Sequence, residues 1–442
     1  MSEQKNTFLS NSIITLTRQV VSIVIGLLLL IIIARALGSS GYGKYTLITY
    51  LPLMLMTFLN LGLNTSTIYF VSKKEIELKE AFVTSVVSAI VLALVSIVIG
   101  FFTIFLLGDS EFSAVDSSLL YLSLCALPFM FLMIFLQTIF QGMQNFKLFN
   151  TVLVVQQFGT LLLLILVLFV FQLGLKGALL SFILGYVLSV MYSIVMLFKV
   201  YEIEFSLRYF SWKYIKLSIS YGLKAHISNI MTFLNYRLGV LLLGVFVSPA
   251  SVGIYVAAVN LGEKISIFSQ SFSQVLLPRI ASSNQEEDRN KITAIVSRFI
   301  MIFIVCVSLV IFLFSDLIFH VFGEDYRSSA HILNLLLPGL TVLAVEKILS
   351  NDLAGRGRPD LNMYVSFVNV ALNVVLNLLL IPRYGIQGAA VSSSITYIIS
   401  FIIKVILYKN VTKQPIKEFL LIKGADITMV KDLAKRLKRK PA

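Results

Sequence analysis

The sequence predicts an all-α integral membrane protein with twelve transmembrane helices. Three observations predict this class: 58% of the 442 residues are hydrophobic, twelve long apolar stretches follow one another, and no soluble domain separates them. Each stretch approaches or exceeds the roughly 20 apolar residues that a helix needs to cross a hydrocarbon core about 30 Å thick. A water-soluble fold of this composition would aggregate, so the function must be a membrane function.

The predicted spans extend from Asn11 to Leu407. They cover residues 11–34, 45–70, 81–107, 119–140, 150–171, 177–198, 217–247, 253–276, 292–314, 330–350, 362–380 and 388–407. If both termini are inside, the cytoplasmic segments hold 24 of the 36 Lys and Arg residues, the opposite loops hold 5 and the spans hold 7. The positive-inside rule therefore places both termini in the cytoplasm and the chain in the cell inner (cytoplasmic) membrane.

The formal net charge of +14 is concentrated at the C-terminus, where ten basic residues lie between Lys409 and Lys440. Next to an anionic inner leaflet, each such residue contributes about 1 kcal/mol of attraction. We therefore expect this tail to bind the lipid bilayer and not nucleic acid.

The chain contains an internal duplication at a shift of about 210 residues. At a shift of 210 or 211, matching residues are Gly43, Tyr45, Pro128, Gly174, Gly177, Ala178 and Ser181 with Gly253, Tyr255, Pro338, Gly385, Gly388, Ala389 and Ser392. Six spans per half is an even number, so the halves have the same orientation, which predicts two parallel six-helix bundles related by a pseudo-twofold axis. The predicted domains are residues 1–198, a cytoplasmic connector 199–216, residues 217–407 and a basic cytoplasmic tail 408–442. Three prolines inside spans, Pro52, Pro128 and Pro338, are candidate bend points.

Polar and basic residues gather on the first two spans of each half. The span at 217–247 leaves only about a third of its circumference apolar at 100° per residue. These spans contain one acid, Glu263, and four basic residues, Arg18, Lys224, Arg237 and Lys264. Basic residues exposed to lipid at mid-membrane are expensive, about 2.5 to 3.5 kcal/mol each, so they predict a cationic, solvated cavity. An ion pair between Glu263 and Lys264 or Arg237 would neutralise part of the positive charge of this cavity.

The acid Glu346, beside Lys347 in the tenth span, is interpreted either as part of a structural ion pair or as a coupling site for Na⁺ or H⁺. The sequence has no phosphate-binding loop of the GxxxxGK[ST] type and no His or Cys pattern with metal-ligand spacing. We therefore expect a transporter without an enzymatic site, a metal centre or another cofactor, apart from a coupling ion.

Three glycine- or proline-containing motifs carry a family resemblance. They are ARALGSSGYGKYTL at 34–47, LPRI at 277–280 and IPRYGIQGAAVSSS at 381–394. Together with the spans and the duplication, they resemble the Wzx-type polysaccharide transporters of the multidrug/oligosaccharidyl-lipid/polysaccharide exporter superfamily. The resemblance implies a MATE-like exporter fold. It also implies flipping of a polyprenyl-pyrophosphate-linked oligosaccharide, an O-antigen, capsule or exopolysaccharide repeat unit, to the outer leaflet by alternating access. The polysaccharide polymerase and other membrane proteins of the pathway are the expected partners.

On this interpretation, the four basic residues bind the pyrophosphate, which Arg contacts with two parallel hydrogen bonds. The expected sugar contacts are Asn60, Asn64, His226, Asn229 and Asn235. A cation-coupled multidrug antiporter of the same superfamily is the alternative, with Glu263 and Glu346 binding the coupling ion. A polymerase or a non-transporting scaffold is a third hypothesis, and the short outer loops disfavour the polymerase.

Overall fold

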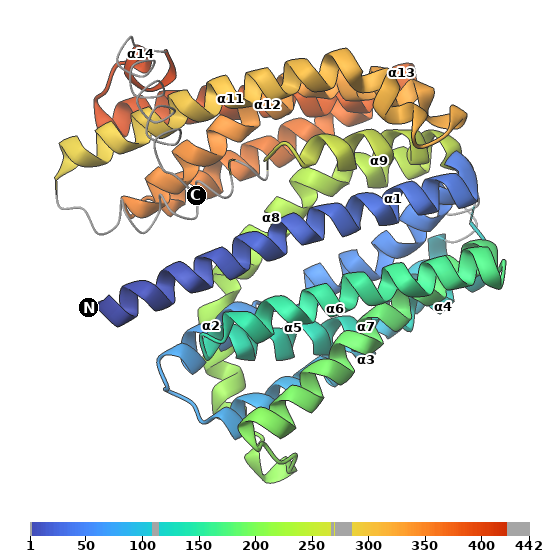
Figure 1. Cartoon of the computed structure of the whole chain (residues 1–442), viewed down its shortest axis with the longest axis vertical. Helices are drawn as coiled ribbons and strands as arrows, with labels where there is room; N and C mark the ends of the chain where they lie inside the picture. Colours follow the sequence, from blue (N-terminus) through green and yellow to red (C-terminus); the bar gives the residue numbers. More distant parts are fainter. Residues whose placement is uncertain (1, 108–114, 267–268, 270–284, 422–442) are drawn as a thin grey trace, which may run out of the picture. The chain divides into compact units, whose positions relative to one another are not determined.

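The computed structural model describes residues 2–107, 115–266, 269 and 285–421, except for the side chains of residues 2–16 and 224. Every regular element among these residues is a helix (Figure 1), so the predicted all-α class is confirmed. The α-helices are α1 (Ser2–Leu59), α2 (Leu63–Ser72), α3 (Leu78–Leu107), α4 (Ser117–Leu124), α5 (Leu127–Gly142), α6 (Phe146–Ile165), α7 (Gly174–Tyr201), α8 (Trp212–Phe246), α9 (Pro249–Glu263), α11 (Glu286–His320), α12 (Arg327–Gly355), α13 (Pro359–Thr412) and α14 (Ile416–Leu420).

Among the described residues, nine helical stretches are long and apolar enough to cross a membrane. Two of them contain a glycine with non-helical backbone angles, Gly38 in α1 and Gly385 in α13, so each consists of two helical segments. The predicted span 253–276 begins in α9 and continues past the described residues. The helices are therefore consistent with twelve spans.

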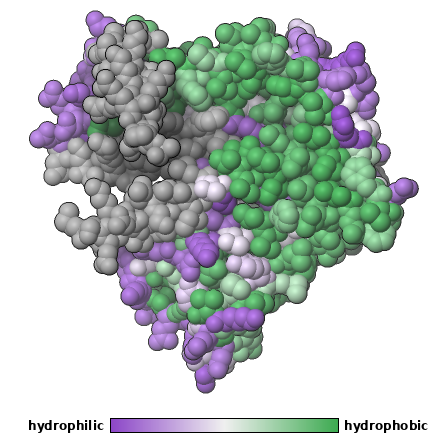
Figure 2. Space-filling model, in the orientation of Figure 1, coloured by the Kyte–Doolittle hydropathy of each residue, from purple (hydrophilic) through white to green (hydrophobic). Residues whose placement is uncertain are grey.

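The surface has the character of a membrane protein. Large apolar side chains are exposed, among them Phe105, Leu106 and Leu313, which expose 70%, 71% and 66% of their surface. Apolar side chains cover much of the face visible in Figure 2. Exposed apolar area of this extent requires lipid around it, because soluble proteins rarely expose large contiguous apolar patches.

Two predicted spans are interrupted, and the second interruption lies next to the predicted bend point Pro128. The span 45–70 is interrupted between α1 and α2, where Leu61 and Gly62 adopt φ of 56° and 72°. The span 119–140 is interrupted between α4 and α5, and Pro128 occupies the first turn of α5, where its missing N–H costs no hydrogen bond. Pro52 and Pro338 lie inside α1 and α12.

The order of helices follows the internal duplication. The long helix α3 corresponds to α11, and α6 and α7 correspond to the two segments of α13. Gly174, which begins α7, and Gly385, which divides α13, both have a φ of 54°. A positive φ of this kind favours glycine, because it has no Cβ. The duplicated glycine therefore marks the same tight turn in both halves.

The chain divides into two compact units. Unit 1 comprises residues 1–257 and 321–326, and unit 2 comprises residues 258–320 and 327–442. In unit 1, α5 contacts α2, α3, α6 and α7 and buries Leu136 and Phe140 completely. In unit 2, α12 contacts α11 and α13. The predicted division at residues 198 and 217 concerns the sequence repeat and stays a prediction.

Within unit 1, matching glycines of the two repeats lie against each other. A Cβ on Gly43 would meet the Pro249 carbonyl oxygen at 1.7 Å, and a Cβ on Gly253 would meet the Ser39 carbonyl oxygen at 2.1 Å. Ser39 and Pro249 are themselves related by the shift of 210 residues. A contact in which each residue meets the counterpart of its own partner is what a twofold axis generates. This contact between the repeats is therefore locally symmetric.

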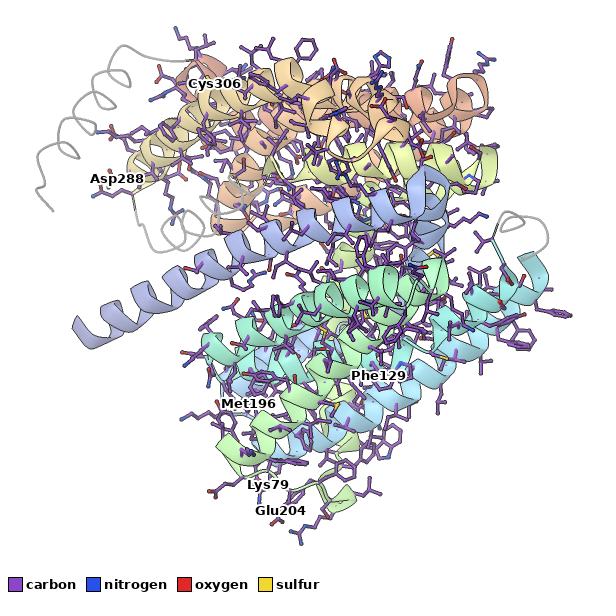
Figure 3. All side chains as sticks on the ribbon, turned by 45° about the vertical axis from the view of Figure 1, so that its right-hand side comes forward. Lys79, Phe129, Met196, Glu204, Asp288 and Cys306 are labelled. Carbon is purple, nitrogen blue, oxygen red and sulfur yellow. The ribbon has the colours of Figure 1, made fainter. Side chains whose placement is uncertain are left out.

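The polar segments of unit 1 that precede α3 and α8 share one end. Figure 3 shows Lys79 and Glu204 at the same end of this unit. The Lys79 ammonium lies 5.6 Å from the centre of the Tyr209 ring, which joins the start of α3 to the connector. By the positive-inside rule this is the predicted cytoplasmic end.

Candidate functional site

The most polar helix, α8, runs antiparallel to the chain segment 39–72 within unit 1. Contacting pairs, in order along α8, are Tyr214 with Thr67, Ser218 with Ser66, Gly222 with Gly62, His226 with Phe58, and Arg237 with Tyr50. Residue numbers rise on one side as they fall on the other, which defines antiparallel packing. The polar residues that the sequence singled out on α8 thus lie along the second half of α1 and along α2.

Arg237 is held against α1 at the far end of this series of contacts. Its Nη1 donates a hydrogen bond to the Tyr50 hydroxyl at 3.2 Å, and its guanidinium lies 5.6 Å from the centre of the Tyr50 ring. A guanidinium over an aromatic face is attracted by the ring quadrupole. Tyr50 therefore fixes the orientation of one predicted anion-binding group.

Two of the five predicted sugar contacts, His226 and Asn229, have different surroundings. His226 is buried, and its Nε2 lies 3.0 Å from the Phe58 carbonyl oxygen, so the ring joins α8 to α1. Asn229, three residues later, is exposed. Of these two residues, Asn229 has the side chain that a ligand would reach first.

Three predicted asparagines carry buried acceptor atoms. The side-chain oxygens of Asn60, Asn64 and Asn235 are buried and find no hydrogen-bond partner among the residues that the structure describes. An unpaired buried polar oxygen costs about 1 to 3 kcal/mol, and ordered water or a ligand hydroxyl would remove this cost. All three residues lie in unit 1: Asn60 in the break between α1 and α2, Asn64 on α2 and Asn235 on α8.

Arg18 contacts protein. In the first half of α1 its Nε donates to Asn150 Oδ1 on α6 at 3.0 Å, and the Asn150 amide donates in turn to the Phe146 carbonyl. The predicted orientation away from lipid thus corresponds to a contact with α6.

The remaining predicted charged residues lie in other parts of the chain. The side chain of Lys224 lies outside the described part of the structure. Lys264 and Glu263 belong to unit 2, whereas Arg18 and Arg237 belong to unit 1. Glu263 interacts electrostatically with Lys347 of the same unit. A single cavity that unites all four basic residues stays a prediction.

Glu346 has a partner that sequence proximity did not suggest. Lys404, on the second segment of α13, places its Nζ 3.8 Å from Glu346 Oε1 and donates to Asn362 Oδ1 at 2.6 Å. Lys404 is 1% exposed and Glu346 is 9% exposed. The neighbour Lys347 donates to the Ser266 hydroxyl at 3.0 Å. Adjacent residues on a helix do not face each other, which is why the partner comes from another helix.

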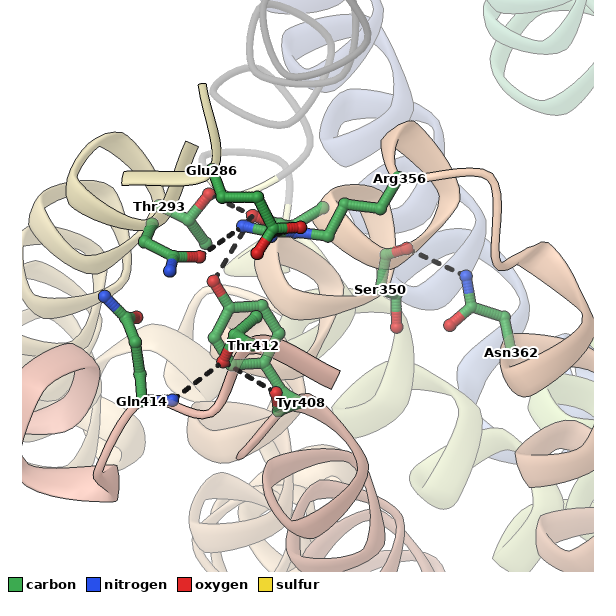
Figure 4. Close-up of polar contacts among 10 residues, drawn as sticks. Glu286, Thr293, Ser350, Arg356, Asn362, Tyr408, Thr412 and Gln414 are labelled. Carbon is green, nitrogen blue, oxygen red and sulfur yellow. Dashed lines mark hydrogen bonds and ion pairs between the residues drawn. The ribbon is translucent and has the colours of Figure 1, made fainter. Parts of the chain in front are cut away.

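A second buried polar network in unit 2 was missed by the sequence analysis. Asp352, completely buried near the end of α12, pairs with Arg356 and accepts hydrogen bonds from Thr293 and Tyr408. Figure 4 shows Thr293, Arg356 and Tyr408 converging from α11, α12 and α13. The prediction placed residues 351–361 in a loop, so Asp352 carried no signal. Among the described residues, no group of three or more His, Cys, Asp or Glu side chains has a metal-binding arrangement.

The geometry defines a helical membrane protein. Polar residues line the interface of α8 with α1 and α2, which we call the polar seam. Comparison with known proteins gives the family. The family described as "Polysaccharide biosynthesis protein" matches residues 8–284, so the chain belongs to this family. The family described as MatE matches residues 225–379. The resemblance drawn from the three motifs is thereby confirmed.

Two curated relatives illustrate this similarity. The chain is 25% identical over 206 residues to the "Probable low-salt glycan biosynthesis flippase Agl15" of Haloferax volcanii, covering 46% of this chain and 44% of that protein. It is 24% identical over 211 residues to the "Putative O-antigen transporter" of Shigella flexneri, covering 47% and 50%. The matches thus span half or less of the length of these relatives.

Solved structures share the fold over nearly the whole chain. The inward-facing conformation of a multidrug resistance MATE family transporter of the MOP superfamily aligns with a TM-score of 0.75 and 15% identity, covering 88% of this chain and 94% of that one. The lipid II flippase MurJ, in an inward closed conformation, aligns with a TM-score of 0.74 and 16% identity, covering 98% and 94%. The predicted MATE-like exporter fold is confirmed.

Proposed function

We propose that this protein is a flippase that moves a polyprenyl-pyrophosphate-linked oligosaccharide from the cytoplasmic to the outer leaflet of the cytoplasmic membrane. It acts as a transporter and not as an enzyme, with both termini in the cytoplasm. The saccharide would be a repeat unit of an O-antigen, a capsule or an exopolysaccharide. A polysaccharide polymerase and other membrane proteins of the same pathway are the partners that this role requires.

One observation carries the proposal: the chain belongs to a family of polysaccharide biosynthesis proteins while having the fold of membrane exporters. The family match includes Arg18, Arg237 and the three predicted sugar contacts with buried oxygens, Asn60, Asn64 and Asn235. Relatives named as a glycan flippase and an O-antigen transporter support the same substrate class.

The chemistry of the seam suits this substrate. A guanidinium binds pyrophosphate oxygens through two parallel hydrogen bonds, which makes Arg237 the preferred anion contact. Asparagine oxygens in the seam accept hydrogen bonds from sugar hydroxyls. With the cell interior negative, outward movement of a doubly charged head group is favoured by about 4 to 5 kcal/mol per 100 mV. The membrane potential therefore supplies a driving force without a coupling ion.

A cation-coupled multidrug antiporter is the alternative, favoured by the MatE match to residues 225–379. It would use Na⁺ or H⁺ at Glu263 or Glu346. The ion pair between Glu346 and Lys404 disfavours Glu346 in that role, because an ammonium 3.8 Å away competes with a coupling cation.

The test is the leaflet on which the lipid-linked oligosaccharide accumulates when the chain is deleted, determined by impermeant labelling of membrane vesicles of known orientation. We expect accumulation on the cytoplasmic leaflet, reversed by the wild-type protein and, in part, by Arg237→Lys, but not by Arg237→Ala. Arg208→Ala, which removes an exposed arginine of the connector, is the matched control and should transport normally. An unchanged leaflet distribution after deletion would refute the flippase proposal.

A further inference from the structure

A cavity of about 660 Å³ lies between α2 and α8 at the predicted cytoplasmic end of unit 1. Residues from both helices and from the segment after α2 line it, among them Thr65, Tyr69, Phe70, Glu75, Ser220 and Tyr221. None of these residues belongs to the predicted pyrophosphate or sugar contacts. The cavity therefore needs a separate explanation.

The cavity has a rigid wall. Beside the cavity, the two helices are packed closely at Gly62 and Gly222, where the Cβ of any other residue would meet backbone within 2.6 Å. The Tyr214 hydroxyl donates to Thr67 Oγ1 at 2.9 Å and joins the same two helices. Thr65 and Tyr69 lie one helical turn apart on α2 and line the cavity. The packing of α2 on α8 thus prepares the cavity before any ligand binds.

An aromatic platform forms one part of the cavity. The rings of Tyr69 and Tyr221 stack with their centres 4.3 Å apart and an angle of 25° between their planes. Phe70 supports the pair edge-on, 5.7 Å from Tyr221. Tyr221 remains 44% exposed. The ring therefore offers a flat apolar face and a hydroxyl to a molecule in the cavity.

The charges at the rim exclude some ligands. Lys73 donates to the Tyr69 hydroxyl, lies 4.5 Å from the centre of the Tyr69 ring and places its Nζ 3.7 Å from Glu75 Oε1. The Lys73 ammonium thus already occupies the position that a cationic ligand would take. Glu75 in turn would repel a pyrophosphate. An acyl chain has no group that could form hydrogen bonds with the carboxylate of Glu75 or the hydroxyls of Thr65 and Ser220.

We infer that this cavity binds the saccharide part of the lipid-linked substrate, with a sugar ring stacked on Tyr221 and its hydroxyls hydrogen-bonded to Glu75 and Ser220. A sugar presents an apolar C–H face and a polar rim, which matches an aromatic surface bordered by a carboxylate and hydroxyl groups. The inference rests on the proposed function. It adds a sugar subsite at the side from which the substrate would enter.

The position of the cavity along α8 fits the same substrate. Lys224, a proposed pyrophosphate residue, follows Tyr221 by three residues, about 4.5 Å along the helix axis. A saccharide at Tyr221 would therefore place its pyrophosphate one helical turn further into the membrane. Along α8, the saccharide at Tyr221 is followed by the pyrophosphate at Lys224, and these groups follow each other in the same order in the proposed substrate.

The test compares two probes on the purified full chain in detergent: lipid-linked oligosaccharide extracted from cells that lack this chain, and polyprenyl pyrophosphate without sugar. We expect Tyr221→Ala to weaken equilibrium binding of the sugar-bearing probe by about tenfold, as loss of one stacking platform does, and to leave the sugar-free probe unchanged. Tyr221→Phe keeps the ring and should bind the sugar-bearing probe within about twofold of the wild type. Trp212→Ala removes an exposed aromatic residue of the same helix outside the cavity and serves as the control.

Equal binding of the sugar-bearing probe by the wild type and Tyr221→Ala would overturn the inference, as would equal weakening of both probes. Loss of ethidium binding in Tyr221→Ala with saccharide binding intact would overturn it in favour of a drug site. If the wild-type protein binds neither probe, the proposed function itself fails. The two failures are therefore distinguishable.

Discussion

The ion pair between Lys404 and Glu346 gives the sharpest test of the structure of unit 2. Lys404→Met removes the ammonium while keeping an unbranched side chain, and it leaves Glu346 without its 3.8 Å partner and Asn362 without its donor. Two unit charges about 4 Å apart attract each other by about 4 kcal/mol at an effective dielectric constant of 20. Removing one partner of a buried pair costs about 3 to 5 kcal/mol, because the other charge stays buried.

The assay is thermal unfolding of the purified protein in detergent. We expect Lys404→Met to lower the apparent melting temperature by about 3 to 5 °C, a shift estimated from the unfolding entropy of a chain of this length. Lys409→Met, five residues later and exposed, is the matched control and should change it by less than about 1 °C. The double variant Lys404→Met/Glu346→Gln leaves no buried charge and should recover most of the loss.

Transport by the double variant then decides between the two interpretations of Glu346. Restored stability with normal flipping identifies a structural pair. Restored stability with abolished flipping identifies a coupling site. A melting temperature of Lys404→Met equal to that of the wild type would refute the reasoning, since no buried pair of this geometry can be broken without cost.

Two further predictions concern packing within the units. Gly43→Ala should destabilise the protein by about 1 to 3 kcal/mol or more and abolish flipping, because the new Cβ would overlap the backbone of Pro249. The control Gly159→Ala should be tolerated, because its Cβ would meet only the tip of a leucine side chain. Equal melting temperatures of the two variants would contradict this prediction. Asp352→Ala should lower the free energy of unfolding by about 3 to 5 kcal/mol, because it leaves Arg356 without its buried partner. A melting temperature equal to that of the wild type would show that the Asp352 network contributes nothing to stability.

Much of the fold follows from hydrophobic length and from the repeat. Apolar stretches of spanning length predict helices in lipid, because a helix satisfies its own backbone hydrogen bonds. The shift of about 210 residues predicted corresponding helices, and the identical φ of Gly174 and Gly385 agrees with it. The break at Leu61 was not predicted, because the hydrophobic pattern continues through it and only the local backbone changes. The break at Cys125 lies three residues before Pro128, which was a predicted bend point.

The site was predictable where polarity is periodic along one helix. The polar face of α8 identified His226 and Arg237 before their contacts with Phe58 and Tyr50 were known. Pairings between distant helices were not predictable, because nothing in one sequence relates Glu346 to Lys404, 58 residues later. The cavity at Tyr221 was missed for the same reason, since its wall is formed by two helices about 150 residues apart.

The spacing of basic residues along α8 has a consequence for the path of the head group in the proposed function. Lys224 and Arg237 are thirteen residues apart in one continuous helix, which is about 20 Å along its axis. The two residues therefore lie at different depths in the membrane. In the proposed function they serve successive positions of the head group: Lys224 while the saccharide lies on Tyr221, and Arg237, fixed by Tyr50, after the head group has moved toward the outer side. The buried oxygen of Asn235 lies close to the second position and the exposed Asn229 between the two. A path of this kind needs no stronger binding at its end than at its start, because the membrane potential acts on the charged head group throughout the movement.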